Sequence, residues 1–329
     1  MNSYNMVKER DYAIDIVKCL AVILIINSHS DIMYPRMQML ATGGAIGDCL
    51  FLFCSGFTLF WGGQKSFGSY YKRRISRIYP SVFAAAVFTH ILSLRPQINF
   101  MQLLGGEFII AIMIYYLLLY LVRKYAINRL DFVLSTVMII SLIVYILWFP
   151  DKYDVSSKGI YGITTLYRWL PYFGAMLLGA VIGMKRKELK YHAWWDFIKL
   201  ITCVFAFYGI QFAAKMWRPI APWQIVTLLS LAGITVYFYK WCNCSWMKRI
   251  YQSKWGNIII MIVGGLCLES YLIQYSLFTD KLNGIWPFNI IIIVLVILLC
   301  SYFVRCFARL FAQTFRTEDY EWKKIISLF

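Results

Sequence analysis

Residues 12–33 read YAIDIVKCLAVILIINSHSDIM, and this run decides the fold. Most of its side chains are apolar, and about 20 apolar residues are what an α-helix needs to cross a bilayer. Similar runs recur along the chain, which has 329 residues, 60% of them hydrophobic and 15% charged. A soluble domain is roughly 45–50% apolar and 25% charged. The composition therefore excludes an ordinary soluble protein and predicts a polytopic membrane protein.

Ten such runs can be placed between loops that carry basic residues. We expect helices in all of them, because in lipid each spanning segment must satisfy its own backbone hydrogen bonds. The predicted fold is an all-α membrane helix bundle, with residues 1–329 forming one integral-membrane domain. The expected spans lie near 12–33, 41–62, 79–94, 103–122, 132–149, 169–184, 196–214, 222–239, 257–279 and 286–308.

The basic residues predict the orientation of these spans. An even number of spans places both termini on one side, and with the termini inside, the cytoplasmic segments hold 23 Lys and Arg against 8 outside. Cytoplasmic loops of membrane proteins are enriched in these residues. We therefore predict cytoplasmic termini in a multi-pass protein of the cell membrane, surrounded by membrane lipid. The same rule accounts for the net charge of +17 without a nucleic-acid partner.

The first expected span concentrates ionisable residues. Lys18 and His29 are eleven residues apart, which returns to within about 20° of the same helix face, and His29 should lie about 16 Å further toward the outer side. Ionisable side chains within a membrane are costly and usually functional. Two structural alternatives stay open: Asp15 and Lys18 form an ion pair within the helix, or His29 is a buried histidine bonded to a nearby carbonyl.

Three other expected spans also carry an acidic residue. Asp48 lies in the second span at a depth similar to that of His29, while Glu107 and Glu269 lie in the fourth and ninth. Nearer the cytoplasmic side of the second span is Ser55-Gly56, where a glycine permits close approach of a helix or a ligand. The nine cysteines lack the spacing of a zinc or redox site, so no metal is expected.

A basic cluster precedes the third expected span. Arg74 and Arg77 are three residues apart and so share one helical face. Two guanidinium groups beside a membrane cleft suit a phosphate-bearing ligand. A cluster at a cytoplasmic helix end also serves as a topology signal, and both interpretations stay open on this evidence.

Asp15-Ile-Val-Lys18, followed by ten residues and His29, resembles the opening signature of integral-membrane acyltransferase family 3, which O-acetylates cell-envelope polysaccharides. In that signature an acidic residue precedes a basic residue, and a histidine follows. Later segments are similar to further family patterns and follow in the family's order. They are Gly47-Asp48 through Ser55-Gly56-Phe57, Arg74-Ile-Ser-Arg77-Ile-Tyr79-Pro80, Gly105-Gly-Glu107-Phe through Tyr115-Tyr116, and Glu269-Ser-Tyr-Leu-Ile-Gln274.

The resemblance implies that acyl-CoA, usually acetyl-CoA, binds from the cytoplasm, and that a hydroxyl of a glycan or lipid-linked glycan accepts the acyl group on the other face. His29 would act as general base on that hydroxyl or carry the acyl group itself. Asp48 or Glu269 would orient the imidazole. The residues expected to bind acyl-CoA are Lys18, Ser55, Arg74 and Arg77, with the basic groups on phosphates and Ser55 beside the pantetheine arm.

Two positions depart from the family pattern. Lys18 replaces the usual arginine and lacks its bidentate fork, and Gln274 stands where the last segment often has a histidine. Two other functions compete with the enzyme. A polysaccharide or lipid-linked glycan transporter or flippase would line its path with the charged face of the first helix, and a scaffold subunit would tolerate loss of His29.

Overall fold

The computed structural model of the chain describes residues 10–60, 66–92, 100–148, 160 and 165–328, and every regular element within these ranges is helical. Three expected span ends, at 62, 94 and 149, and most of the expected outer loop 150–168 lie outside the described residues. The helices are α1 Tyr12–Ser28, α2 Gly44–Leu59, α3 Phe67–Ile91, α4 Phe100–Leu103, α5 Gly106–Tyr125, α6 Leu130–Trp148, α7 Thr165–Lys185, α8 Ala193–Met216, α9 Thr227–Cys242, α10 Ser245–Gln252, α11 Lys254–Gly265, α12 Cys267–Ile273, α13 Phe288–Thr314 and α14 Trp322–Ile326.

Each of the ten expected spans coincides with a helix or, for 257–279, with the pair α11 and α12. Six helical segments of the described residues are long and apolar enough to cross a membrane alone, and α11 with α12 makes up to seven. The chain is therefore an all-helical, multi-pass membrane protein. This count of up to seven includes neither α1, which has 17 residues, nor α3, which contains the basic cluster, nor α7. Ten spans and cytoplasmic termini stay predictions.

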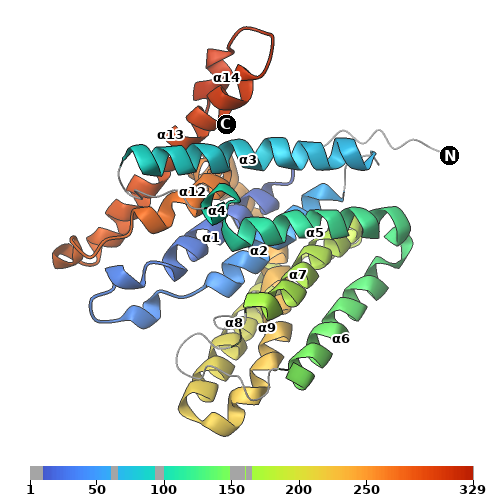
Figure 1. Cartoon of the computed structure of the whole chain (residues 1–329). Coiled ribbons are helices and arrows are strands. Elements are labelled where there is room, and N and C mark those ends of the chain that lie inside the picture. The colour runs from blue at the N-terminus through green and yellow to red at the C-terminus, as the bar shows by residue number, and fades with distance from the viewer. Residues whose placement is uncertain (1–9, 61–65, 93–99, 149–159, 161–164, 329) are drawn as a thin grey trace.

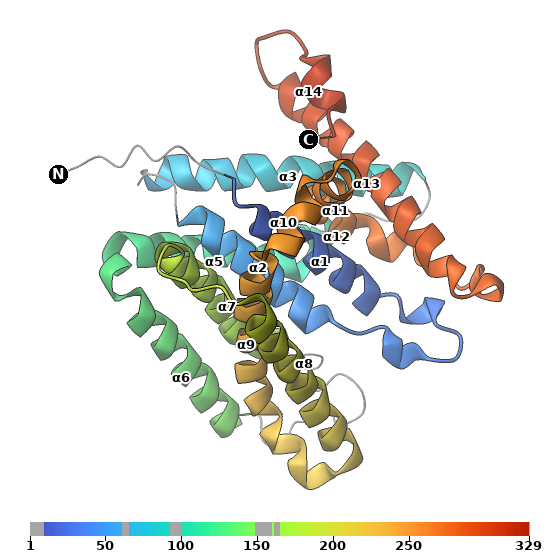
Figure 2. The same ribbon diagram turned by 180° about the vertical axis from the view of Figure 1, so that it is seen from behind.

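The helices form two groups around the pair α1 and α2 (Figures 1 and 2). Helices α6 to α9 lie on one side of this pair, α11 to α13 lie on the other, and α3 crosses over the bundle beside α13. A close contact joins α2 to α7. A Cβ on Gly56 would collide with the Met176 carbonyl, and one on Gly179 would collide with the Phe53 carbonyl. The two backbones can pack this closely only because both positions are glycine.

Three differences from the predicted helices affect the candidate site. First, α1 ends at Ser28 rather than 33, because the following loop folds back and its Leu40 and Thr42 carbonyls accept hydrogen bonds from the Asn27 amide. Second, α3 begins at Phe67, twelve residues before 79, so the basic cluster lies inside the helix.

The third difference is a break in the expected span 257–279. Helices α11 and α12 meet there at a bend of 54°. The bend follows Gly264-Gly265, and glycine pairs are frequent sites of helix kinks. The Gly265 carbonyl accepts a hydrogen bond from the Arg305 side chain of α13 instead, so a group that the kink frees is satisfied from a neighbouring helix.

Candidate active site

A large cavity of about 750 Å³ lies between α1, α2, α3, α5, the α11–α12 bend and α13. Its walls bring together most of the predicted site residues from distant parts of the chain. The predicted residues that line this large cavity are Lys18, Ser55, Arg74, Arg77 and Glu269.

The large cavity is positively charged. Its carboxylates are engaged: Asp11 accepts a hydrogen bond from Tyr239, Asp15 pairs with Arg10, and Glu269 pairs with an arginine of α13. Burial raises the pKa of Asp11 above its ordinary value, which reduces its share of negative charge. Six cationic side chains against three acidic ones favour an anionic ligand. The cations are Arg10, Lys18, Arg74, Arg77, Arg305 and Arg309.

Arg74 is fixed by aromatic rings. Its guanidinium carbon lies 5.2 Å from the centre of the Tyr70 ring and 5.5 Å from that of Tyr116, within the range of cation–π attraction. Its buried Nε has no hydrogen-bond partner among the described residues. A buried donor without a partner is costly, so a ligand oxygen at this position would stabilise it. Arg77, one turn further along α3, lines the same cavity and is exposed.

Lys18 is available to a ligand, because the ion pair considered between Asp15 and Lys18 is not formed. Asp15 Oδ2 instead pairs with Arg10 Nε at 2.6 Å and accepts a hydrogen bond from Tyr251 at 3.1 Å. Lys18 makes no salt bridge within the described part of the chain and lines the large cavity. The predicted ligand-binding role of Lys18 therefore has a structural basis.

Ser55 and Gly56 face different neighbours. Ser55 lines the large cavity together with Tyr116. Gly56 faces the backbone of α7. Of the two possibilities for this glycine, a helix or a ligand, the structure shows the helix, and only Ser55 is placed beside a ligand path.

The two carboxylates expected to orient His29 have other partners. Glu269 Oε1 accepts a hydrogen bond from Ser81 at 2.9 Å, and Oε2 pairs with Arg305 at 2.9 Å. Glu269 thus ties α12 to α3 and α13. Asp48 faces α7, where it accepts a hydrogen bond from Tyr172 near the Arg168 guanidinium. Orientation of His29 by either carboxylate stays a prediction.

His29 directly follows α1 and is half-buried. Its Nε2 lies 2.9 Å from the Tyr275 hydroxyl, and the two ring centres are 4.7 Å apart. Tyr275 belongs to the single 3₁₀ turn Gln274–Ser276 that follows α12. The sequence prediction did not include this tyrosine.

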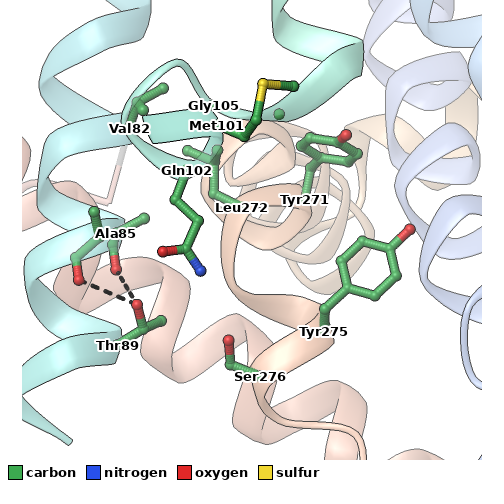
Figure 3. A pocket seen from close by; sticks show the side chains of 12 residues that line it. Val82, Ala85, Thr89, Met101, Gln102, Gly105, Tyr271, Leu272, Tyr275 and Ser276 are labelled. Atoms are coloured by element: carbon green, nitrogen blue, oxygen red, sulfur yellow. Dashed lines mark hydrogen bonds between the residues drawn. The ribbon is translucent and has the colours of Figure 1, made fainter. Parts of the chain in front are cut away.

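A small cavity of about 310 Å³ adjoins Tyr275 (Figure 3). Its wall comes from α3, α4, the start of α5 and the turn after α12. Tyr271 lines both the large and the small cavity, and Tyr275 lines the small one while contacting His29. Tyr271 is therefore a wall residue that the two cavities share, and Tyr275 connects the small cavity to the imidazole.

Sequence reasoning missed three residues of this arrangement: Arg305, Tyr271 and Tyr275. Arg305 could have been found, because it lies inside the expected span 286–308 and a cation in an apolar run indicates a partner or a ligand. The tyrosines gave no such signal, since this chain has 24 of them and tyrosine is common at membrane interfaces.

Comparisons with known proteins agree with this architecture. A model of the family described as an acyltransferase domain matches residues 11–306, which include most of the residues that line the two cavities. No curated protein and no solved structure matches the chain.

Proposed function

The chain belongs to integral-membrane acyltransferase family 3, and from this premise we propose that it transfers an acyl group, acetyl in the first instance, from cytoplasmic acyl-CoA to a hydroxyl of a cell-envelope or exported glycan. Its place of action is the cell membrane. The observation that carries the proposal is the large cationic cavity, which shares the wall residue Tyr271 with a second cavity lined by Tyr275, the partner of His29.

The donor fits the large cavity by charge and by position. CoA carries several phosphate charges, and arginine forks bind phosphate oxygens bidentately. Arg74, held between two tyrosine rings, offers a fixed fork with an unpartnered Nε, and Lys18 adds a flexible cation. Both residues lie on helix segments that the charge distribution assigns to the cytoplasmic side, where acyl-CoA is found.

His29 supplies the proton chemistry in this proposal. As a general base, the imidazole takes the proton of the acceptor hydroxyl while its oxygen attacks the thioester carbonyl. The carbon–sulfur bond then breaks, and the CoA thiolate receives the proton. In the covalent alternative the imidazole nitrogen first accepts the acyl group and releases CoA, and the acceptor oxygen attacks the acyl-imidazole afterwards. Tyr275 keeps the ring oriented in either route through its 2.9 Å contact with Nε2.

The test is release of free CoA from acetyl-CoA by purified protein in detergent, with and without an envelope glycan preparation. We expect glycan-stimulated release by the native protein and a loss of roughly 100-fold or more in His29→Ala, the range for removal of a general base. His90→Ala is the matched control, because His90 is exposed at the end of α3 and should be dispensable.

The outcomes separate the candidate mechanisms and functions. Release that needs both His29 and glycan supports direct transfer, whereas His29-dependent release without glycan supports an acyl-imidazole that leaks to water. A flippase or a scaffold subunit would show neither. A folded protein that binds acetyl-CoA but releases no CoA with any glycan fraction would refute the proposal.

A further inference from the structure

We propose that the small cavity is the acceptor site, and that it accepts an uncharged, hydroxyl-rich unit the size of a single sugar ring. The inference rests on the proposed function, because it specifies which part of the acceptor enters the site and what chemistry recognises it. It predicts that the acetylated residue of the glycan is neutral.

The two cavities differ in the charge of the side chains that line them. Among the described residues, the large cavity has nine ionisable side chains of Arg, Lys, Asp or Glu, whereas none lines the small cavity. Its walls consist of alanine, valine, leucine, methionine and glycine together with serine, threonine, glutamine and tyrosine. An anionic sugar would lose hydration here without gaining a counter-charge, which is costly. A neutral polyol loses much less.

The wall of the small cavity also contains a buried hydroxyl group. Ser276 Oγ is buried, lines the small cavity and has no hydrogen-bond partner among the described residues. By contrast, the Thr89 hydroxyl in the same wall already donates to the Ala85 carbonyl at 2.9 Å. Figure 3 shows Gln102 and Ser276 on the two sides of the open space, with Tyr271 above Tyr275. Hydroxyl and amide groups that both donate and accept match the hydroxyls of a sugar.

Part of the wall of the small cavity is formed by glycine backbone. Gly105 and Gly106 have φ values of +85° and +81°, a conformation that side chains rarely adopt. A Cβ on Gly106 would meet no atom nearer than the Tyr271 hydroxyl, at 4.0 Å. The glycine therefore leaves space open that packing alone does not require. At about 310 Å³ the small cavity is at the lower end of ligand sites, which suits one ring rather than a chain of sugars.

The position of the small cavity suits an acceptor that arrives from the outer side. The small cavity is lined by the C-terminal half of α3, by α4 with the start of α5, and by α12 with the turn that follows it. The distribution of basic residues assigns all three to the outer side. A glycan would thus reach the small cavity from outside, while acyl-CoA reaches the large cavity from inside. Tyr275 stands between the small cavity and His29, so the acceptor hydroxyl is delivered next to the base.

The experiment measures the KM for glycan and the KM for acetyl-CoA separately in two variants of Ser276. Ser276→Ala removes one hydrogen bond and should raise the KM for glycan roughly two- to tenfold. Ser276→Met also fills the small cavity and should raise it at least about tenfold. The KM for acetyl-CoA should be unchanged in both. Ser141→Ala is the control, because Ser141 is buried and its hydroxyl is bonded within α6.

The second measurement tests neutrality. The envelope glycan is separated by anion exchange into neutral and acidic fractions, and each is offered to the native protein with labelled acetyl-CoA. We expect label in neutral sugar residues. Label confined to acidic residues, or an unchanged KM for glycan in folded Ser276→Met, would overturn the inference. Failure of the proposed function is distinct, since the native protein would then release no CoA with either fraction.

Discussion

Replacement of Glu269 separates two roles that the sequence alone could not distinguish. If the carboxylate orients His29, its loss should abolish transfer in a folded protein. If it anchors Arg305 and Ser81, as their 2.9 Å contacts indicate, its loss should lower stability. We expect the second result, because both carboxylate oxygens are used by α3 and α13.

The size of the effect follows from burial. The side chains of Arg305 and Glu269 are only 14% and 6% exposed, and removal of one partner from a buried ion pair costs about 3–5 kcal/mol. At about 2 °C per kcal/mol for a protein of this size, Glu269→Ala should lower the Tm by roughly 6–10 °C. Glu269→Gln keeps the shape and one acceptor oxygen, so its cost should be nearer 1.5–3 kcal/mol.

The assay is thermal unfolding in detergent, followed by tryptophan fluorescence, with CoA release measured on the same samples well below the Tm. Glu107→Gln provides the control, since this exposed carboxylate is bonded only weakly, to Trp169 at 3.3 Å. It should shift stability by no more than about 0.5 kcal/mol. An unchanged Tm in Glu269→Gln together with activity as low as in His29→Ala would refute the anchoring role and assign Glu269 to the chemistry.

Three further substitutions test the large cavity and the packing behind it. Arg74→Gln should raise the KM for acetyl-CoA roughly 10- to 100-fold by loss of charge-assisted hydrogen bonds. Arg73 is exposed and lies outside the large cavity, so Arg73→Gln should leave this KM unchanged. Equal KM values in the two variants would mean that Arg74 serves only as a topology signal. Lys18→Arg should retain most activity because the charge remains, and complete loss would mean that the ammonium itself is required. Gly56→Ala should destabilise the contact of α2 with α7 by about 1–3 kcal/mol or more. Gly209 has open space around it, so Gly209→Ala should be neutral or stabilise α8 by up to about 1 kcal/mol. Similar Tm values for the two variants would contradict the close packing of α2 against α7.

The sequence predicted the helices well because apolar runs are a local property. All ten expected runs correspond to helical structure. Their ends were less predictable, since these depend on distant partners. The first span was predicted to reach residue 33, but the loop that returns to Asn27 ends α1 at Ser28. The bend after Gly265 likewise depends on Arg305, which lies 40 residues further along the chain.

The candidate site shows the same pattern: several of its residues could be predicted from the sequence, but the partners with which they pair could not. Lys18 and Arg74 were expected to bind one ligand, and both line the large cavity, whereas Glu269 was expected beside His29 and lies on the wall of the large cavity instead. The salt-bridge partners of the acidic residues could not be predicted from helix periodicity. Asp15 is three residues from Lys18 but pairs with Arg10, and Glu269 pairs with Arg305 rather than with the imidazole. A choice among several cations within reach depends on helix rotation and crossing angle, which sequence spacing does not fix.

These partnerships determine how charge is distributed along the route between the cavities. Asp15 and Glu269 each neutralise an arginine, which leaves Lys18, Arg74, Arg77 and Arg309 as the cations on the wall of the large cavity that form no salt bridge within the described ranges. Beyond Tyr271, no Arg, Lys, Asp or Glu of the described part of the chain lines the small cavity. A polyanionic donor is therefore stabilised on one side of Tyr271 and disfavoured on the other. The phosphates of CoA would be held back in the large cavity while the uncharged thioester end advances toward His29, so the charge pattern itself would set the direction of transfer.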